Sequence, residues 1–268
     1  MRPSFGTDGV RGRANAELTP ELVLALGRAA ARRLGPGPML VGRDTRRSGP
    51  MLQAALTAGL ASEGMDVVDL GVLPTPGVAF LSQRRDQPAA MISASHNPFA
   101  DNGVKFFLAG GRKLPVQVEA GLEAELAGIL EDRDRDHDRD RGHPGAARPE
   151  GRGVGGAGPE PGAAEEYTRH LVSTVPAGSG LGGLSVVIDC AHGAASALAA
   201  GVFRQAGAEV LVLSAQPDGC NINDRCGSTD PGSLGRAVIE GGADLGLAFD
   251  GDADRVVAVD HQGTLVDG

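Results

Sequence analysis

Short apolar runs alternate with stretches of helical periodicity through the first 130 residues. Helices are predicted at 19–35, 51–61 and from 75 onward, and strands at 39–41, 67–70 and 89–92. The first helix has a clear start, because the hydroxyl of Thr19 precedes Pro20 at the first helical position. Strands separated by helices of this length form βαβ units, so the pattern predicts a mostly parallel, buried sheet.

The same alternation returns in the last hundred residues. Helices are predicted at 163–172, 194–206 and 233–240, and strands at 184–189, 209–213 and 243–249. A β-hairpin is expected at 256–266. The predicted fold class is therefore α/β, with two consecutive domains whose sheets are mixed but mostly parallel.

The region between these units lacks apolar periodicity. Residues 132–141 alternate Asp and Arg around His137, and glycine and proline follow. We expect 131–162 to be a flexible, solvated insert or linker between domains at 1–130 and 163–260. The chain stops inside the predicted hairpin, so we expect a fragment in which 261–268 begins a truncated third domain.

Composition narrows the possible partners. The chain has 268 residues, with 34 acidic against 25 basic side chains and a net charge of −9, which disfavours a nucleic-acid partner. No stretch approaches the roughly 18 apolar residues of a membrane helix, and the start lacks a signal peptide's apolar core. Cys190, Cys220 and Cys226 have no zinc-like pairing and are expected to be reduced packing thiols. We therefore expect a cytoplasmic protein that binds neither nucleic acid nor membrane.

Three aspartates at alternate positions, Asp250, Asp252 and Asp254, follow a predicted apolar strand. The glycine after the first allows the chain to curl, so the carboxylates can converge as hard oxygen ligands of the kind that Mg²⁺ prefers. An EF-hand calcium loop is excluded, because it needs glycine and glutamate where this chain has Arg255 and His261. A solvated acidic turn is the alternative.

A polar loop at 93–102 follows another predicted strand and contains Ser95. Such loops often bind ligands in α/β proteins, although Ser95 could instead cap a helix. The sequence at 101–103 predicts a tight hairpin turn that returns Lys105 towards this loop, as a phosphate clamp, a proton carrier or an ordinary surface lysine. Near the start, a glycine-rich turn carries Arg11, which could bind an anion.

Taken together, these segments resemble the α-D-phosphohexomutase family. The resemblance rests on three motifs in the family's order: FGTDGVRG, ISASHNPFADNGVKFF and LAFDGDADR. Two further stretches, VVIDCAHGAAS and CNINDRCGSTDP, resemble the bacterial phosphoglucosamine mutase branch rather than the phosphoglucomutases or phosphomannomutases. Nearly the whole chain is covered except the Asp/Arg-rich insert.

The resemblance implies roles for individual residues. Ser95 would carry a phosphoryl group, and an oxygen of that phosphoserine would complete the Mg²⁺ ligands Asp250, Asp252 and Asp254. His96 would take part in proton transfer.

The basic residues of the motifs would act on phosphate. Arg11, Lys105 and Arg255 would bind phosphate, with Arg11 and Lys105 also among the catalytic residues.

The implied reaction interconverts glucosamine 6-phosphate and glucosamine 1-phosphate through a bisphosphorylated sugar, in the pathway to UDP-N-acetylglucosamine and the cell wall. The partner would be a small sugar phosphate, and a homodimer is possible. Family members have four domains, and the third and fourth have no counterpart here, so we expect little activity from this chain alone. A phosphomannomutase/phosphoglucomutase, or a non-catalytic phosphate- or metal-binding module, is the alternative.

Overall fold

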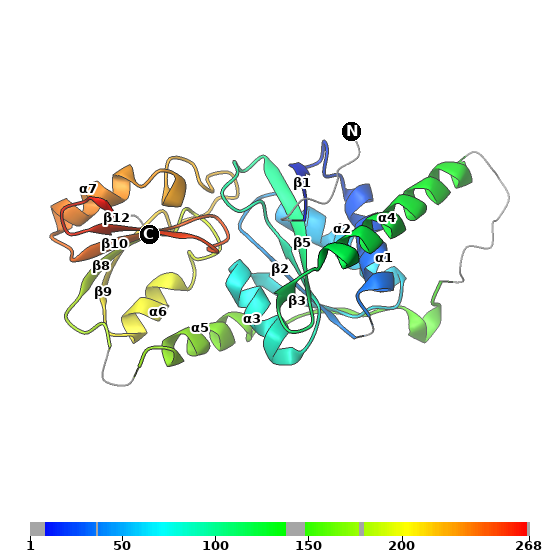
Figure 1. Cartoon of the computed structure of the whole chain (residues 1–268), viewed down its shortest axis with the longest axis horizontal. Coiled ribbons are helices and arrows are strands. Elements are labelled where there is room, and N and C mark those ends of the chain that lie inside the picture. The colour runs from blue at the N-terminus through cyan, green and yellow to red at the C-terminus, as the bar shows by residue number, and fades with distance from the viewer. Residues whose placement is uncertain (1–8, 36, 138–147, 177–179, 267–268) are drawn as a thin grey trace.

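The computed structural model describes residues 9–35, 37–137, 148–176 and 180–266, which form two neighbouring α/β units (Figure 1). The first unit has a seven-stranded sheet in the order β1-β5-β4-β2-β3-β7, with β6 paired to β5. The second has a five-stranded sheet in the order β12-β11-β10-β8-β9. Both sheets are mixed, with parallel strands at one side and antiparallel strands at the other, as the predicted fold class requires.

The strands of the first sheet are β1 (Val10–Arg13), β2 (Met39–Arg43), β3 (Val67–Val72), β4 (Ala89–Ile92), β5 (Asp101–Leu108), β6 (Arg112–Lys113) and β7 (Ala157–Pro159). Those of the second are β8 (Ser185–Asp189), β9 (Glu209–Leu213), β10 (Leu245–Phe249), β11 (Val256–Asp260) and β12 (Leu265–Val266). The helices are α1 (Pro20–Arg33), α2 (Gly49–Ser62), α3 (Thr75–Arg85), α4 (Val116–His137), α5 (Ala163–Ser173), α6 (Ala199–Gln205) and α7 (Gly232–Gly241), with 3-10 turns at Gly151–Gly153 and Gly227–Thr229.

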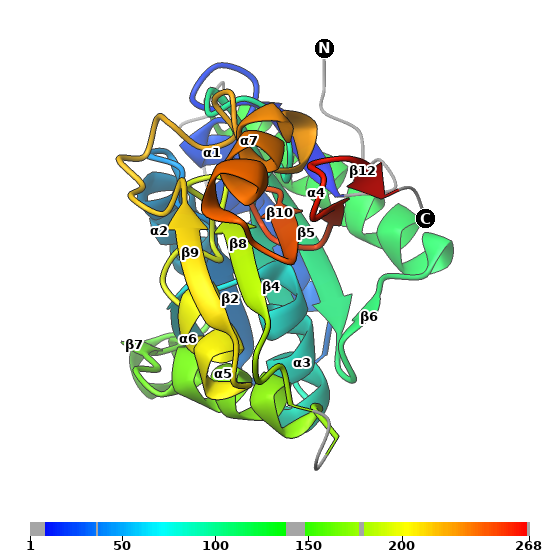
Figure 2. The ribbon, with the colours of Figure 1, turned by 90° about the vertical axis from the view of Figure 1, so that its left-hand side faces the viewer.

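Successive side chains along the buried strands contribute to hydrophobic cores on both faces of the first sheet. In β2, Met39 and Val41 join the core beneath α1, α2 and α4, whereas Leu40 points to the opposite core, where α3 and α5 pack. Successive side chains of a strand point to opposite faces, so a continuously apolar strand needs helices on both sides. The same rule applies in the second unit, where Val186 packs towards α6 and Val187 towards α7. In Figure 2 this second sheet faces the viewer.

Helices α1 and α2 approach each other closely through two glycines. A Cβ on Gly59 would lie 2.2 Å from the carbonyl oxygen of Leu24, and one on Gly27 would lie 2.5 Å from that of Leu56. No larger residue fits either position without moving backbone, so these glycines set the distance between the two helices.

The structure corrects several predictions from sequence. Residues 101–103 do not form a hairpin turn, because they begin β5 and pair with β1. Within 131–162, α4 continues to His137 and β7 adds an edge strand beside β3, so the described part of this segment is not simply a linker. Strand β12 pairs with β11 and so extends the second sheet rather than starting a third domain.

Some predicted features lie outside the described residues, namely the first half of FGTDGVRG, positions 138–147 and the last two residues. Among the helices that the structure does describe, none combines the length and apolar character needed to cross a membrane.

Candidate active site

Two loops, one from each unit, meet at the carboxyl ends of central strands. Ser95 lies in the loop after β4, and Asp250 begins the loop after β10. The hydroxyl of Ser95 donates a hydrogen bond of 2.5 Å to Oδ2 of Asp250, and Ser95 is only 1% exposed. Parallel strands bring their carboxyl ends to one edge of a sheet, which explains why both loops emerge towards the junction.

The three predicted metal ligands converge. Asp250, Asp252 and Asp254 each offer an oxygen within 4.8 Å of the others. Asp250 and Asp252 are fully buried, and Asp254 is more exposed. Within the described part of the chain, Oδ1 of Asp252 is buried without a hydrogen-bond partner. A buried carboxylate oxygen of this kind fits a hard divalent cation, so these residues could hold a metal ion.

The electrostatics of this cluster depend on burial. Desolvation, reinforced by the neighbouring charge of Asp252, raises the pKa of Asp250 to about 6. Burial also acts to raise the pKa of Asp252, but the adjacent Lys105 ammonium outweighs it, and the pKa of Asp252 is lowered. Concentrated negative charge in a buried site favours binding of a cation.

Lys105 neutralises part of the acidic cluster. It lies on β5 opposite Met91 of β4, and its Nζ is 2.7 Å from Oδ2 of Asp252 and 3.4 Å from Oδ2 of Asp254. The side chain is buried, so it is not an ordinary surface lysine. The sheet, not a hairpin turn, brings Lys105 to the site.

The remaining predicted residues surround the serine. Nδ1 of His96 lies 3.4 Å from Ser95 Oγ, and partial burial, together with the positive charges of Arg255 and Arg11, lowers the pKa of His96. Arg255 donates its backbone N–H to Asp250 at 3.3 Å, while its side chain is half exposed. Arg11 is on β1 and packs against Gly103 of β5. The structure therefore brings all the predicted site residues to one region.

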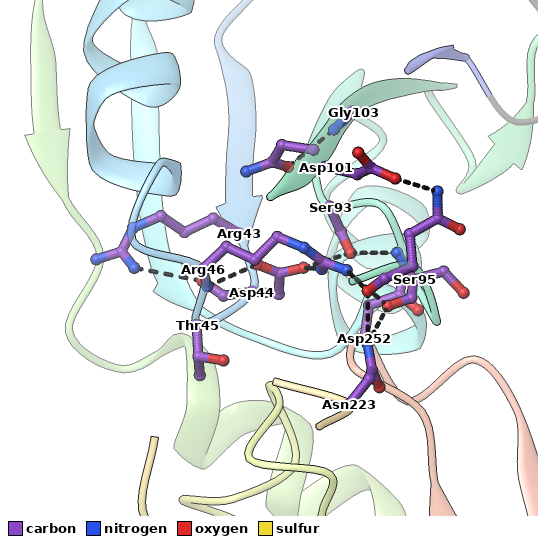
Figure 3. Close-up of polar contacts among 12 residues, drawn as sticks. Arg43, Asp44, Thr45, Arg46, Ser93, Ser95, Asp101, Gly103, Asn223 and Asp252 are labelled. Atoms are coloured by element: carbon purple, nitrogen blue, oxygen red, sulfur yellow. Dashed lines mark hydrogen bonds and ion pairs between the residues drawn. The ribbon is translucent and has the colours of Figure 1, made fainter. Parts of the chain in front are cut away.

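Sequence reasoning missed a second layer of polar residues. Thr75, at the start of α3, donates its hydroxyl to Oδ2 of Asp252 at 2.7 Å. Asp44, Arg46 and Ser93 form a buried network below the serine loop (Figure 3). The charged residues after the predicted strand at 39–41 could have indicated Asp44 and Arg46. That strand ends at the same edge of the sheet as the strand before the serine loop.

Comparison with known families agrees with this geometry. A model described as phosphoglucomutase/phosphomannomutase, alpha/beta/alpha domain I, matches residues 2–133, and the corresponding domain II model matches residues 165–263. The chain belongs to this family. The resemblance to the α-D-phosphohexomutases is thereby confirmed.

Individual relatives extend the comparison. The chain is 52% identical to a phosphoglucosamine mutase of Rhodococcus jostii over 98% of its own length and 57% of that protein. It is 53% identical to a phosphoglucosamine mutase of Symbiobacterium thermophilum, of which it covers 58%. Among solved structures, a phosphoglucomutase/phosphomannomutase family protein of Burkholderia thailandensis has a TM-score of 0.78 at 27% identity, covering 98% of this chain and 55% of that one. The chain thus spans rather more than half the length of the relatives it matches.

Proposed function

We propose that this chain provides the phosphoserine and metal part of a phosphoglucosamine mutase, which interconverts glucosamine 6-phosphate and glucosamine 1-phosphate. The observation that carries the proposal is the 2.5 Å contact between the Ser95 hydroxyl and Asp250 inside the acidic cluster. Identity of about half to the phosphoglucosamine mutases supports glucosamine over other hexoses.

Asp250, Asp252 and Asp254 would hold Mg²⁺, together with an oxygen of phosphorylated Ser95. When bound, the metal would neutralise negative charge on the phosphoryl group. The unpartnered oxygen of Asp252 supports this assignment within the described residues. Lys105, Arg11 and Arg255 supply further positive charge around the phosphate, which is the main requirement of phosphoryl transfer.

The two transfers are the reverse of each other. In the first, the bond from phosphorus to Ser95 Oγ breaks while a bond to the free sugar hydroxyl forms, and the hydroxyl proton passes to the departing Oγ. His96 lies close enough to Ser95 Oγ to relay this proton. In the second, Ser95 Oγ takes the other phosphoryl group from the bisphosphate, and a proton returns to the sugar.

The proposal places the reaction in the cytoplasm, on the route to UDP-N-acetylglucosamine. This location follows from the proposed substrates, because sugar phosphates are charged and do not cross a bilayer unaided.

Intact-mass analysis tests the proposal. Incubation of the chain with Mg²⁺ and glucosamine 1,6-bisphosphate is expected to add one phosphate, which Ser95→Ala abolishes and chelation of the metal prevents. Ser173→Ala is the matched control, because Ser173 is exposed at the end of α5 and its replacement should leave the adduct intact. An adduct on Ser95→Ala, or faster phosphorylation by the glucose or mannose bisphosphate, would overturn the assignment.

A further inference from the structure

Two side chains, one from each unit, hold the same two carbonyl groups of the serine loop. The guanidinium of Arg46 donates to the carbonyl oxygens of Ser95 at 3.1 Å and Asn97 at 2.6 Å. Nδ2 of Asn223 donates to the same oxygens at 2.9 and 3.1 Å. Figure 3 shows both donors converging on the loop.

The loop needs such support because of its backbone conformation. Ser95 has a φ of +52°, in the left-handed region that non-glycine residues rarely adopt. Such a conformation persists where the surroundings determine it from several sides. The N–H of Ser95 donates to the Ser93 hydroxyl at 2.9 Å, and its carbonyl is the group that Arg46 and Asn223 hold.

Arg46 is itself fixed by burial and charge. Its side chain is fully buried and paired with the carboxylate of Asp44, which also accepts a hydrogen bond of 2.6 Å from Ser93. Both terminal nitrogens of the Arg46 guanidinium donate hydrogen bonds, and a buried ion pair held in this way tolerates little movement.

Thr45 and Arg47, which alternate with Asp44 and Arg46 along the chain, contact the second unit. Thr45 donates its hydroxyl to the carbonyl of His192 at 2.6 Å, and the N–H of Arg47 donates to the carbonyl of Gly219 at 2.9 Å. A Cβ on Gly219 would lie 3.1 Å from the Cβ of Arg47, so the two segments are in close contact. The segment 44–47 therefore touches the serine loop on one side and the second unit on the other.

Asn223 reaches the loop from the second unit. It lies in the stretch 220–231, to which the proposed reaction gives no role, and its N–H donates to the carbonyl of Ala191 at 3.0 Å. The Ser95 carbonyl that it binds also packs on the acidic loop, since a Cβ on Gly251 would lie 2.7 Å from that oxygen. Any displacement of this carbonyl would move Ser95 relative to Asp250.

We propose that Asn223 and Arg46 are positioning residues that orient Ser95 towards the acidic cluster only when the two units are docked. Neither touches the reacting hydroxyl; both act through the backbone of the loop that carries it. The expected effect of these residues on phosphoryl transfer rests on the proposed function. Their expected effect on the order of the serine loop does not.

Amide hydrogen exchange tests the effect on the loop directly. Asn223→Gly removes the donor while suiting the left-handed φ of +58° at this position. Asn223→Asp keeps the shape but replaces the donor with an acceptor. Arg225→Gly is the matched control, because Arg225 has a φ of +54° in the same loop and a side chain that is 87% exposed.

Exchange at residues 94–97 is expected to accelerate about tenfold in both Asn223 variants, the size of effect that loss of one net hydrogen bond produces. It should be unchanged in Arg225→Gly. Wild-type exchange rates in either Asn223 variant would overturn the proposal.

A second measurement is the initial rate of Ser95 phosphorylation at saturating glucosamine 1,6-bisphosphate. We expect it to fall about tenfold in Asn223→Gly, with Mg²⁺ affinity within about twofold of wild type, since only orientation is lost. If the wild-type chain takes up no phosphate, the proposed function fails while the exchange experiment still decides on positioning. If the wild type is phosphorylated and Asn223→Gly reacts at the same rate, the positioning role fails.

Discussion

The hydroxyl of Ser95 donates to Asp250 across the junction between the two α/β units, although 155 residues separate them in the chain. This contact places the group that would be phosphorylated directly against a carboxylate. A phosphoserine carries about −1.5 to −2 charges at neutral pH, so the two groups would repel strongly unless a cation lay between them. Phosphorylation and metal binding are therefore expected to be linked.

The first prediction concerns this linkage. Phosphorylation of Ser95 should tighten Mg²⁺ binding by about tenfold or more, because a phosphoserine oxygen adds a charged ligand. Isothermal titration of the phosphorylated and unphosphorylated chain measures the difference. Asp252→Asn should weaken Mg²⁺ binding in both forms, whereas Asp224→Asn, at an exposed position of the neighbouring loop, should not. Equal affinities in the two phosphorylation states would contradict the shared site.

The second prediction is a dependence of stability on pH. Burial tends to raise the pKa of Glu63, but hydrogen bonds from Arg32 and Arg28 outweigh it, and the net shift is downward. A carboxyl whose pKa is lower in the folded state stabilises the protein above its unfolded pKa, and this contribution is lost as the pH falls through the folded value.

Glu63→Gln tests that dependence. At pH 7 the variant should be less stable by about 1 kcal/mol, allowing for solvent screening of a partly exposed network. The difference should shrink as the pH falls below the ordinary glutamate value of about 4.3. Urea unfolding at a series of pH values provides the measurement, and a difference that stays constant into acid would refute the assignment.

The third prediction compares two helical glycines. Gly59→Ala should destabilise the first unit by about 1–3 kcal/mol, because the new methyl group would meet the Leu24 carbonyl. Gly128→Ala, on α4 where a Cβ meets nothing within 4 Å, should stabilise it by about 0.5–1 kcal/mol. Thermal unfolding distinguishes the two, and equal effects would show that the α1–α2 contact is not as close as described.

The fourth prediction concerns thiol reactivity. Burial raises the pKa of Cys190 to about 12 and that of Cys226 to about 11, whereas Cys220 is partly exposed. Because the thiolate is the reactive form, iodoacetamide at pH 8 should modify Cys220 in the native protein and leave the other two unmodified. Peptide mapping after labelling checks this, and modification of Cys190 before unfolding would be inconsistent with its burial.

Several helices and strands could be predicted from the sequence because the residues that specify them are adjacent in the chain. The helix beginning at Pro20 has its cap in Thr19, whose hydroxyl accepts the N–H of Leu22 as expected. Strands β2 and β4 were evident because residues buried on both faces must be apolar throughout.

Other elements depended on distant partners. Residues 101–103 have a turn-like sequence, yet pairing with β1 makes them part of a strand, since ladder hydrogen bonds outweigh local preference. Strand β7 has three exposed residues and exists through its pairing with β3. The Asp/Arg run contains neither glycine nor proline before residue 142, so nothing local ended α4 at 131.

The chemically reactive residues of the candidate site could be predicted from the sequence, because a serine loop and an aspartate triplet that follow apolar strands form recognisable motifs. Which residues would support them was decided by the fold. Asp44, Thr75 and Asn223 come from three separate segments, and the sequence does not indicate that they bind the Ser93 hydroxyl, the Asp252 carboxylate and the Ser95 carbonyl, respectively. A hydrogen bond depends on positions within about 3 Å, and such positions exist only after the two sheets have formed and docked.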